Sequence, residues 1–402
     1  DGHILNTDNL QRAINDCGAD DILYVPAGDF LTGALRLHSD LEIYLAKGAV
    51  LQGTTNIHDY SPRIPSRFEG TEMRCYSSLL NAGDMNHKTG PNCHNIIIRG
   101  RGTICGGGQE LARKIIEDER ARIKSFLDDN REFVESCENS DTIPGRVRPR
   151  LINLSNCENV WISGITLKNG PSWNVHMIYC DDIQTDHCTF VSEGVWNGDG
   201  WDPDSSTNCT LFASEFSTGD DAVAIKSGKN PEGNEINRPC AHIRVFDCRS
   251  DCGHGICIGS EMSGGVEDVQ IWDCDLANSL SGIEIKATPK RGGYVRGVTV
   301  RDCITPRVML HSVPYNDDGL PAGAPPKLEH CFFERLTLTA EVQDHDRSRH
   351  DAAPIEIAGF DKPGYEVEDI VFKDITITKP SVALPLGLCK GVTLSNLACV
   401  KE

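Results

Sequence analysis

The sequence lacks a surplus of positive charge. Its 39 Lys and Arg residues stand against 59 Asp and Glu residues, so the formal net charge is −20 at pH 7. Nucleic acids and anionic membrane surfaces both attract basic proteins. The composition therefore argues against either as a partner, although a few local cations could still bind an acidic substrate.

Long hydrophobic runs are missing as well. No apolar stretch approaches the roughly 18 residues that a membrane-spanning helix needs, and residues 1–21 are polar, without the pattern of a targeting segment. We therefore expect no spanning helix. Because the numbering could begin after processing, the missing signal peptide says little about destination.

Zinc-site spacing is the third absence. The chain has 18 cysteines, but they are scattered, and the pair Cys252 and Cys257 has no second pair to complete a tetrahedral set. Cys248, Cys274 and Cys303 each follow an aspartate in a similar setting, and cysteine at a repeated strand position behaves as a small apolar residue. We expect mostly free, stacked thiols and a reducing, cytoplasmic location, or a secreted or periplasmic one if the chain is processed.

A loose internal repeat is what the sequence does contain. Short alternating segments such as CENVWISGITL, NCTLFASEF, EDVQIWDCDL and RGVTVRDCIT recur along it, at spacings of about 22 to 37 residues. Their period of two and their Val, Ile, Thr and Phe content are typical of strands. One unit cannot bury its apolar face alone, whereas stacked units share a continuous core. The pattern predicts an all-β, single-domain parallel β-helix over residues 1–402.

Three segments depart from the repeat. Residues 106–150 are charged and carry apolar side chains at helical spacing between Leu111 and Ile123, which predicts a helix-bearing insertion packed on the solenoid. Residues 6–17, NTDNLQRAINDC, start with a cap signal and continue amphipathically, so we expect a helix that plugs the open end of the core. Residues 313–327, rich in Pro and Gly, should form a loop.

Four polar motifs end predicted strands and lie roughly one coil apart. They are NGDGWDPD at 197–204, GDD at 219–221, CGHGIC at 252–257 and GIEIK at 282–286. Equivalent positions in successive coils lie about 4.8 Å apart, so such motifs become neighbours. The side chains expected on one patch are Asp199, Asp220 or Asp221, His254 and Lys286. A ladder of carboxyl groups raises at least one pKa, which keeps a general acid protonated near neutral pH.

Each motif taken alone has a commoner structural explanation. Paired aspartates beside a glycine usually form a solvated turn, and a Gly-flanked histidine is common in tight turns. The alternating aspartates of 197–204 resemble the start of an EF-hand, but no bidentate Glu follows where one is required. We therefore expect no metal ion or cofactor, and the joint order of the motifs favours a catalytic site.

The adjacency of Asp220 and Asp221 predicts a bend in the backbone. Neighbouring side chains of a regular strand point to opposite faces, so both can reach one cleft only where the strand geometry is broken. Gly219 is the expected hinge.

The succession NGDGWDPDSS, TGDDAVAIKSG, GHGICIGSEMSGGV, GIEIK and RGGYV resembles glycoside hydrolase family 28, which contains the polygalacturonases, and specifically its bacterial exo-acting branch. Residues 6–53 and 148–176 are similar to the family's N-terminal cap, first coils and central coils, so the resemblance covers most of the chain. It implies a right-handed parallel β-helix and hydrolysis with inversion at the anomeric carbon.

The resemblance also implies roles for the polar motifs. Asp220 is similar to the general acid, Asp199 and Asp221 resemble the pair that activates water, and His254 matches the histidine that supports the protonation state of the acid. The usual Asn-Thr-Asp motif reads Asn-Gly-Asp from Asn197. Inversion needs carboxyl groups about 6.5 to 9.5 Å apart, which adjacent coils can supply.

One motif departs from the family. Its usual Arg-Ile-Lys, whose two cations hold a uronic acid carboxylate, reads Glu-Ile-Lys here, so Glu284 replaces a guanidinium and Lys286 is retained. If Glu284 faces the cleft, it repels galacturonate and suits a neutral sugar; if it pairs with Lys286 or Arg291, it only rearranges the site. Further expected substrate contacts are Asn197, Asp202, Lys226, Glu261 and Tyr315.

The leading hypothesis is an inverting hydrolase that releases terminal sugars from pectin-type oligosaccharides, as an exo-polygalacturonase or galacturonidase does, with the 106–150 insertion closing one end of the groove. Because of Glu284, the alternative is the same mechanism on a neutral or rhamnogalacturonan-derived glycoside. A polysaccharide lyase would need a strong base, commonly Arg or Lys, and calcium. A non-catalytic glycan-binding β-helix would not need the carboxylates. The sequence makes no prediction of oligomeric state.

Overall fold

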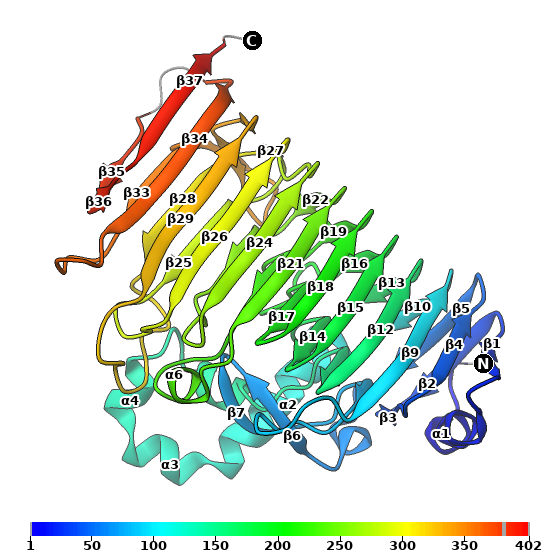
Figure 1. Cartoon of the computed structure of the whole chain (residues 1–402). Coiled ribbons are helices and arrows are strands. Elements are labelled where there is room, and N and C mark those ends of the chain that lie inside the picture. Colours follow the sequence, from blue (N-terminus) through cyan, green and yellow to red (C-terminus); the bar gives the residue numbers. More distant parts are fainter. Residues whose placement is uncertain (1, 380–382, 401–402) are drawn as a thin grey trace.

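The computed structural model describes residues 2–379 and 383–400. Within them, short strands stack into three parallel sheets that run the length of the molecule, from the N-terminal end in blue to the C-terminal end in red (Figure 1). Successive strands of the chain enter the three sheets in turn, so that each coil adds one layer. The predicted right-handed parallel β-helix is confirmed.

The strands of the three sheets are as follows. The largest sheet holds β1 (Ile22–Val25), β4 (Leu41–Leu45), β9 (Cys93–Gly100), β12 (Cys157–Ser163), β15 (Asp181–Asp186), β18 (Thr207–Phe212), β21 (Cys240–Phe246), β24 (Val266–Trp272), β26 (Tyr294–Arg301), β27 (Ile304–Thr305), β29 (Lys327–Glu334), β30 (Thr337–Leu338), β34 (Val367–Ile377), β36 (Cys389–Lys390) and β37 (Thr393–Cys399). The smallest holds β2 (Gly28–Thr32), β5 (Ala49–Gly53), β10 (Thr103–Cys105), β13 (Thr166–Lys168), β16 (Thr189–Val191), β19 (Glu215–Ser217) and β22 (Arg249–Cys252). The third holds β3 (Leu35–Arg36), β8 (Leu80–Ala82), β11 (Ile152–Ser155), β14 (Val175–Ile178), β17 (Trp201–Asp204), β20 (Val223–Ile225), β23 (Gly255–Ile258), β25 (Gly282–Ala287), β28 (Val308–Ser312), β33 (Ile355–Ala358) and β35 (Leu386–Gly387).

Alternation along the strands builds the core. In β4, Leu41, Ile43 and Leu45 are buried while the residues between them are half-buried, as the period of two predicts. The buried apolar residues of the coils join into one cluster that extends from Ile14 to Ile377. Each coil thus buries its apolar face against the next coil rather than within itself.

The cysteines belong to this stacking. All 18 are unpaired, and most are buried. Cys93 lies opposite Cys157 in the register of β9 and β12, and the thiol of Cys274 contacts those of Cys248 and Cys303. The prediction of free, stacked thiols is confirmed, whereas the reducing compartment inferred from them stays a prediction.

Helices occur at the predicted places. Helix α1 (Thr7–Asp16) packs on β2 and β3 at the N-terminal end of the core, with Ile14 buried. The insertion forms α2 (Gly108–Arg122), α3 (Lys124–Asp129), α4 (Arg131–Glu135) and α5 (Thr142–Gly145). Short helices η1 (Ile57–Tyr60) and α6 (Glu232–Ile236) lie in connections. None of the helices in the described parts of the chain is both long and apolar enough to cross a membrane.

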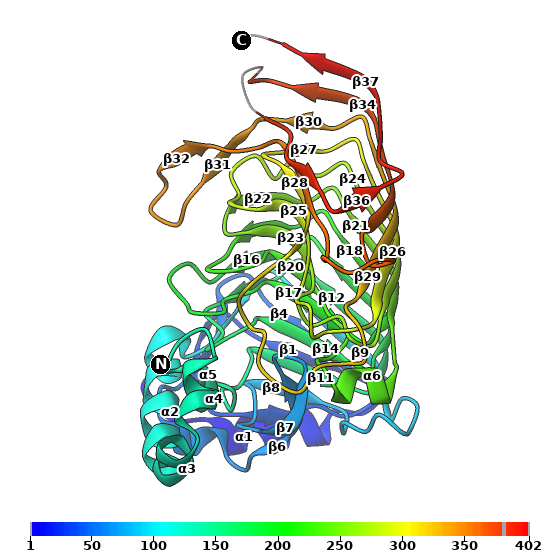
Figure 2. The same cartoon turned by 90° about the vertical axis from the view of Figure 1, so that its left-hand side faces the viewer.

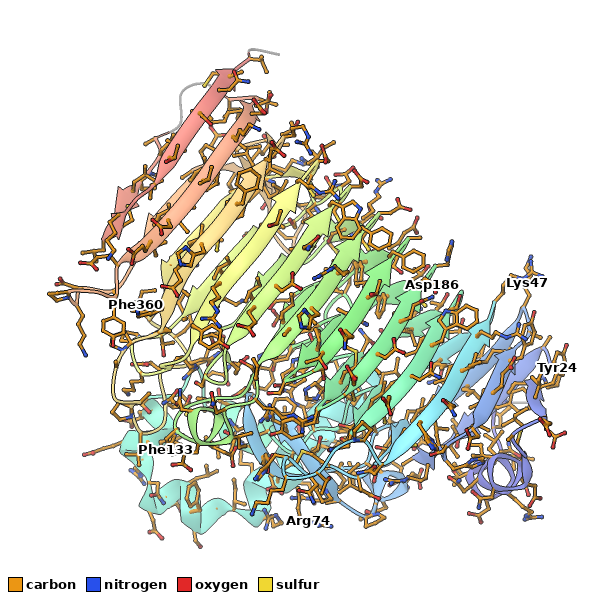
Figure 3. The ribbon with its side chains drawn as sticks, in the orientation of Figure 1. Tyr24, Lys47, Arg74, Phe133, Asp186 and Phe360 are labelled. Carbon is orange, nitrogen blue, oxygen red and sulfur yellow. The ribbon has the colours of Figure 1, made fainter. Side chains whose placement is uncertain are left out.

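Two antiparallel hairpins, β6–β7 (Ile64–Phe68 and Thr71–Cys75) and β31–β32 (Glu341–Gln343 and Arg349–Asp351), stand outside the stack. Hairpin β31–β32 and the insertion project from the same side of the molecule (Figure 2). Arg74 of β7 and Phe133 of α4 both lie in the lower part of the molecule, below the stacked strands (Figure 3). These additions surround the middle strands of the third sheet, where the polar motifs lie.

Arg67 anchors the first hairpin to the solenoid. Its guanidinium is fully buried and donates to Asp204 Oδ1 at 2.6 Å and to Ser205 Oγ at 3.0 Å, both at the end of β17. It also lies over the ring of Tyr179, 4.6 Å from the centroid. Burial alone would raise the pKa of Asp204, but the charge of Arg67 and a hydrogen bond from His176 lower it to about 2.

Candidate active site

The polar motifs meet on four neighbouring strands of the third sheet, β17, β20, β23 and β25. Val223 of β20 pairs with Trp201 of β17 and with Ile256 of β23. Two residues earlier in each chain segment, the same register aligns Asp199, Asp221 and His254 across successive coils. The repeat therefore brings together side chains that lie far apart in the sequence, as predicted.

The backbone bends at the paired aspartates. Strand β20 begins only at Val223, so Asp220 and Asp221 lie in the turn before it and both line one cavity. Glycine is required at 219 for space rather than for a left-handed backbone, because a Cβ there would lie 2.4 Å from the carbonyl oxygen of Val195. The predicted bend is present, and its cause is close packing.

A cavity of about 520 Å³ holds nearly all of the predicted site residues. Its lining includes Asn197, Asp199, Asp220, Asp221, Lys226, His254, Glu261, Glu284, Lys286 and Tyr315. The volume falls in the range of small-molecule sites. Asp202 is the exception. It was predicted to contact the substrate, but its side chain is 0% exposed and does not line the cavity. Asp202 faces away from the core, opposite Trp201, but neighbouring side chains cover it.

His254 connects the two adjacent aspartates. Its Nδ1 lies 2.9 Å from Asp220 Oδ1 and 3.1 Å from Asp221 Oδ1. The thiol of Cys257 donates to Asp221 Oδ1 at 3.0 Å, and Lys286 Nζ lies 3.4 Å from Asp221 Oδ2. The Asp220 side chain is 23% exposed and that of Asp221 4%, so Asp220 is the more accessible acid.

The pKa values of the carboxyl groups diverge. Burial, followed by the charge of Asp202, raises the pKa of Asp199 well above its usual range. Burial would also raise the pKa of Asp220, but the positive charge of His254 outweighs it and lowers that pKa. The expected raised carboxyl pKa is present, at Asp199 rather than Asp220, and in the pair of Asp220 and His254 the imidazole holds the proton.

Lys226 and Glu261 belong to the buried wall rather than to the solvated surface. Lys226 Nζ lies 3.3 Å from Glu261 Oε2, 3.5 Å from Asp199 Oδ2 and 4.7 Å from the centroid of the Trp173 ring. Burial alone would lower the pKa of Lys226, but Glu261 and then Asp199 raise it well above its usual value. This cation holds Asp199 in place.

Glu284 both faces the cavity and pairs. It lies 3.5 Å from Lys286 Nζ, accepts from His311 Nε2 at 2.8 Å and lies 3.4 Å from the sulfur of Cys257. Of the two partners proposed from the sequence, Lys286 is therefore the one found, whereas Arg291 hydrogen-bonds to other residues. Both oxygens of Glu284 are engaged by protein groups.

Several lining residues lie outside the four polar motifs and were not predicted. They are Glu69, Glu138, Trp173, Trp196, Arg307 and His345. Glu69 comes from the turn between β6 and β7, Glu138 from the insertion, and His345 from the turn between β31 and β32. The register of the repeat does not determine where such loops lie. Trp196 could have been predicted, because it directly precedes Asn197 of the first polar motif.

Arg146, which directly follows α5, ties these walls together. Its Nε donates to Glu69 Oε2 at 2.8 Å, and its Nη2 donates to Asp318 Oδ2 at 2.8 Å. Asp318, in the 313–327 loop, also pairs with Lys229. One buried ion network thus joins the first hairpin, the end of the insertion and the loop that carries Tyr315.

Asp220, Asp221 and His254 offer ligand atoms within 4.8 Å of one another, as a metal site would. The groups are already paired among themselves, however, and Lys286 adds a positive charge beside Asp221. An imidazole nitrogen that carries a proton toward a carboxylate cannot also bind a metal. The donor set suits proton transfer better than metal binding.

The model of one family, glycosyl hydrolases family 28, matches residues 17–313. The chain belongs to this family. The resemblance inferred from the polar motifs is therefore confirmed, and the site lies within the matched residues.

Individual relatives agree with the family assignment. A probable polygalacturonase of Vitis vinifera is 34% identical over 75% of this chain and 57% of its own length. An exo-poly-alpha-D-galacturonosidase of Dickeya chrysanthemi is 26% identical over 99% of this chain and 69% of its own length. The solved structure of a hyperthermoactive exopolygalacturonase from Thermotoga maritima has a TM-score of 0.81 at 25% identity and covers 100% of this chain and 89% of that one. The family 28 chain thus spans little more than half the length of the grape relative.

Proposed function

We propose that this family 28 protein is an inverting, exo-acting glycoside hydrolase that releases terminal galacturonate from pectin-derived oligosaccharides. One observation carries the proposal: Asp199, Asp220, Asp221 and His254 line a single cavity. The relatives from Dickeya and Thermotoga, both named as exo-acting on polygalacturonate, support the substrate class.

Asp220 is the proposed general acid. It is the more exposed aspartate of the pair, and His254 Nδ1 lies 2.9 Å from its carboxylate. The proton held on the imidazole can therefore pass to Asp220 and from there to the departing glycosidic oxygen. General acids that are positioned in this way contribute about 10²- to 10⁴-fold to the rate.

Asp221 and Asp199 are the proposed water activators. Lys286 and the Cys257 thiol favour the charged form of Asp221, which makes it the base. Lys226 Nζ lies 3.5 Å from Asp199 Oδ2 and orients that carboxyl group, whose raised pKa favours its neutral form. A water molecule held by them would attack the anomeric carbon on the face opposite the departing oxygen, which inverts its configuration. A carboxylate oxygen of Asp220 and one of Asp221 lie within 4.8 Å of each other, closer than the separation of about 6.5 to 9.5 Å expected from the sequence.

Exo action is supported by the walls of the cavity. Glu69, Glu138, Tyr315 and His345 come from four separate loops that rise around the strand ends. A site walled by several loops suits the end of a chain better than its middle. The neutral-sugar alternative depended on a Glu284 free to bind hydroxyl groups, and Glu284 is instead committed to Lys286 and His311.

Digestion of oligogalacturonides of defined length tests the proposal. We expect galacturonate to be the first product from every length, with inverted anomeric configuration by NMR and undiminished turnover in EDTA. Neutral α-linked aryl glycosides and rhamnogalacturonan fragments serve as comparison substrates. Mid-size fragments at early times would contradict exo action, and an unsaturated product with loss of turnover in EDTA would indicate a lyase.

His254→Gln is expected to move the alkaline limb of the kcat/KM profile to lower pH. Burial alone would lower the pKa of His254, but Asp220 raises it well above the ordinary value, which is about 6.5. The wild-type pair therefore keeps its proton above that pH and loses it as pH rises through the folded-state pKa. Without His254, the proton must sit on a carboxyl group whose ordinary pKa is about 3.9. An alkaline limb that does not move would remove His254 from the proton path.

A further inference from the structure

The cavity is acidic, which poses a problem for an anionic sugar. Its lining holds seven carboxyl groups, Glu69, Glu138, Asp199, Asp220, Asp221, Glu261 and Glu284. Against them stand three Lys and Arg residues, Lys226, Lys286 and Arg307. A uronate entering this surface needs at least one cation that is not already neutralised.

Two of the three cations are occupied. Lys226 lies between Glu261 and Asp199, at 3.3 and 3.5 Å. Lys286 lies between Asp221 and Glu284, at 3.4 and 3.5 Å. Each ammonium group therefore balances carboxylates of the protein before any substrate arrives.

Arg307 differs from both lysines. Within the part of the chain that the structure describes, its guanidinium has no ion pair, and its Nε is buried without a hydrogen-bond partner. Glu284 and Glu356 act on Arg307 only through space, without an ion pair, and both are engaged by His311, which lies 2.8 Å from Glu284 Oε1 and 3.6 Å from Glu356 Oε1. A buried donor without a partner costs free energy, so its retention calls for a ligand that satisfies it.

Arg307 sits one coil beyond the Glu-Ile-Lys motif. The N–H of Ile283 donates to the carbonyl oxygen of Arg307 at 3.1 Å, and Ile283 pairs with Val308 in the register of β25 and β28. Arg307 thus borders the strand that carries Glu284 and Lys286, on the same cavity wall. Arg307 therefore supplies a guanidinium beside the Glu-Ile-Lys motif, in which Glu284 stands where the family usually has an arginine.

We propose that Arg307 binds the carboxylate of the terminal uronate in this cavity, in place of an arginine at position 284. The inference rests on the proposed function and deepens it, because it assigns the residue that selects a charged sugar. A guanidinium can hold a carboxylate with two parallel N–H donors, which a lysine cannot do. Burial lowers the pKa of Arg307, so a bound carboxylate would also relieve the cost of desolvating this charge.

Two substrates that differ by one methyl ester, and so by one negative charge, test the assignment, namely digalacturonate and the form methyl-esterified on its terminal residue. Arg307→Gln should lower kcat/KM on the acid by about 10- to 100-fold, the value of one hydrogen bond to a charged group, and leave the ester unchanged. Arg307→Lys should recover part of the loss. The matched control is Arg301→Gln, which removes a charge from the same coil, paired with Asp302 outside the cavity; it should change neither substrate.

Equal loss on both substrates, or loss on neither, would overturn the role of Arg307. Calorimetric binding of galacturonate separates this inference from the proposed function. Binding that weakens in Arg307→Gln supports the inference even if the wild type hydrolyses no galacturonide, in which case the proposed function alone fails. Binding that is the same with and without Arg307 overturns the inference whatever the turnover.

Discussion

Asp220→Asn is expected to lower kcat by about 10²- to 10⁴-fold, the contribution of a general acid. Asparagine keeps the size of the side chain and an oxygen that can accept from the N–H of Asp221, a bond of 2.9 Å in the parent. It cannot deliver a proton to a departing glycosidic oxygen. Initial rates at saturating oligogalacturonide measure the loss, and the thermal transition checks that the fold is intact.

Asp182→Asn is a matched control for this variant. Asp182 is an exposed residue of β15 with φ of 55°, a backbone conformation that asparagine also tolerates, and it lies outside the cavity. Its rate should equal that of the parent. If the Asp220→Asn protein retained the turnover of the parent, Asp220 would not be the general acid, and the hypothesis of a non-catalytic glycan-binding β-helix would be favoured.

Arg67→Met is expected to lower the free energy of unfolding by about 3–5 kcal/mol, as the loss of one member of a buried ion pair does. Asp204, 0% exposed, would then keep a buried carboxylate whose one remaining partner among the described residues is His176. Burial lowers the pKa of His176 to about 3, so this imidazole is neutral and cannot replace the lost charge. Denaturant unfolding monitored by tryptophan fluorescence measures the change.

Two further variants test whether the buried ion pair causes the expected loss of unfolding free energy in Arg67→Met. Arg74→Met removes a cation from the exposed side of the same hairpin and should change the unfolding free energy little. Arg67→Met combined with Asp204→Asn removes both charges, so it should be less destabilised than the sum of the two single changes. Additive losses would show that the two side chains do not act as a pair.

The repeat made much of the fold and part of the site predictable. Alternating apolar residues identify strands, and stacked strands must place equivalent residues side by side. Asp199, Asp221 and His254 occupy equivalent positions just before β17, β20 and β23, so their proximity follows from the register of these strands. Lys286 was also one of the two partners expected for Glu284, and the two side chains lie 3.5 Å apart.

The remainder of the site depends on contacts that periodicity does not contain. Asp202 faces away from the core as its strand position requires, but the chain around it covers it completely. Glu138 and His345 reach the cavity from an insertion and a hairpin whose placement is set by tertiary packing. Arg307 stands out because its guanidinium has no ion pair among the described residues. That property depends on how the chain packs around it and cannot be read from the sequence.

The ion network at Arg146 also constrains the order in which a growing chain can complete this molecule. The aspartates and His254 can stack as soon as the coils through β25 have formed, but Arg146 must wait for Asp318, which follows it by 172 residues. Contacts over such separations form late, because a long loop must close first. During synthesis the acids would therefore be assembled before the walls around them, and a ribosome-bound chain that ends before Asp318 would hold an open groove instead of an enclosed pocket.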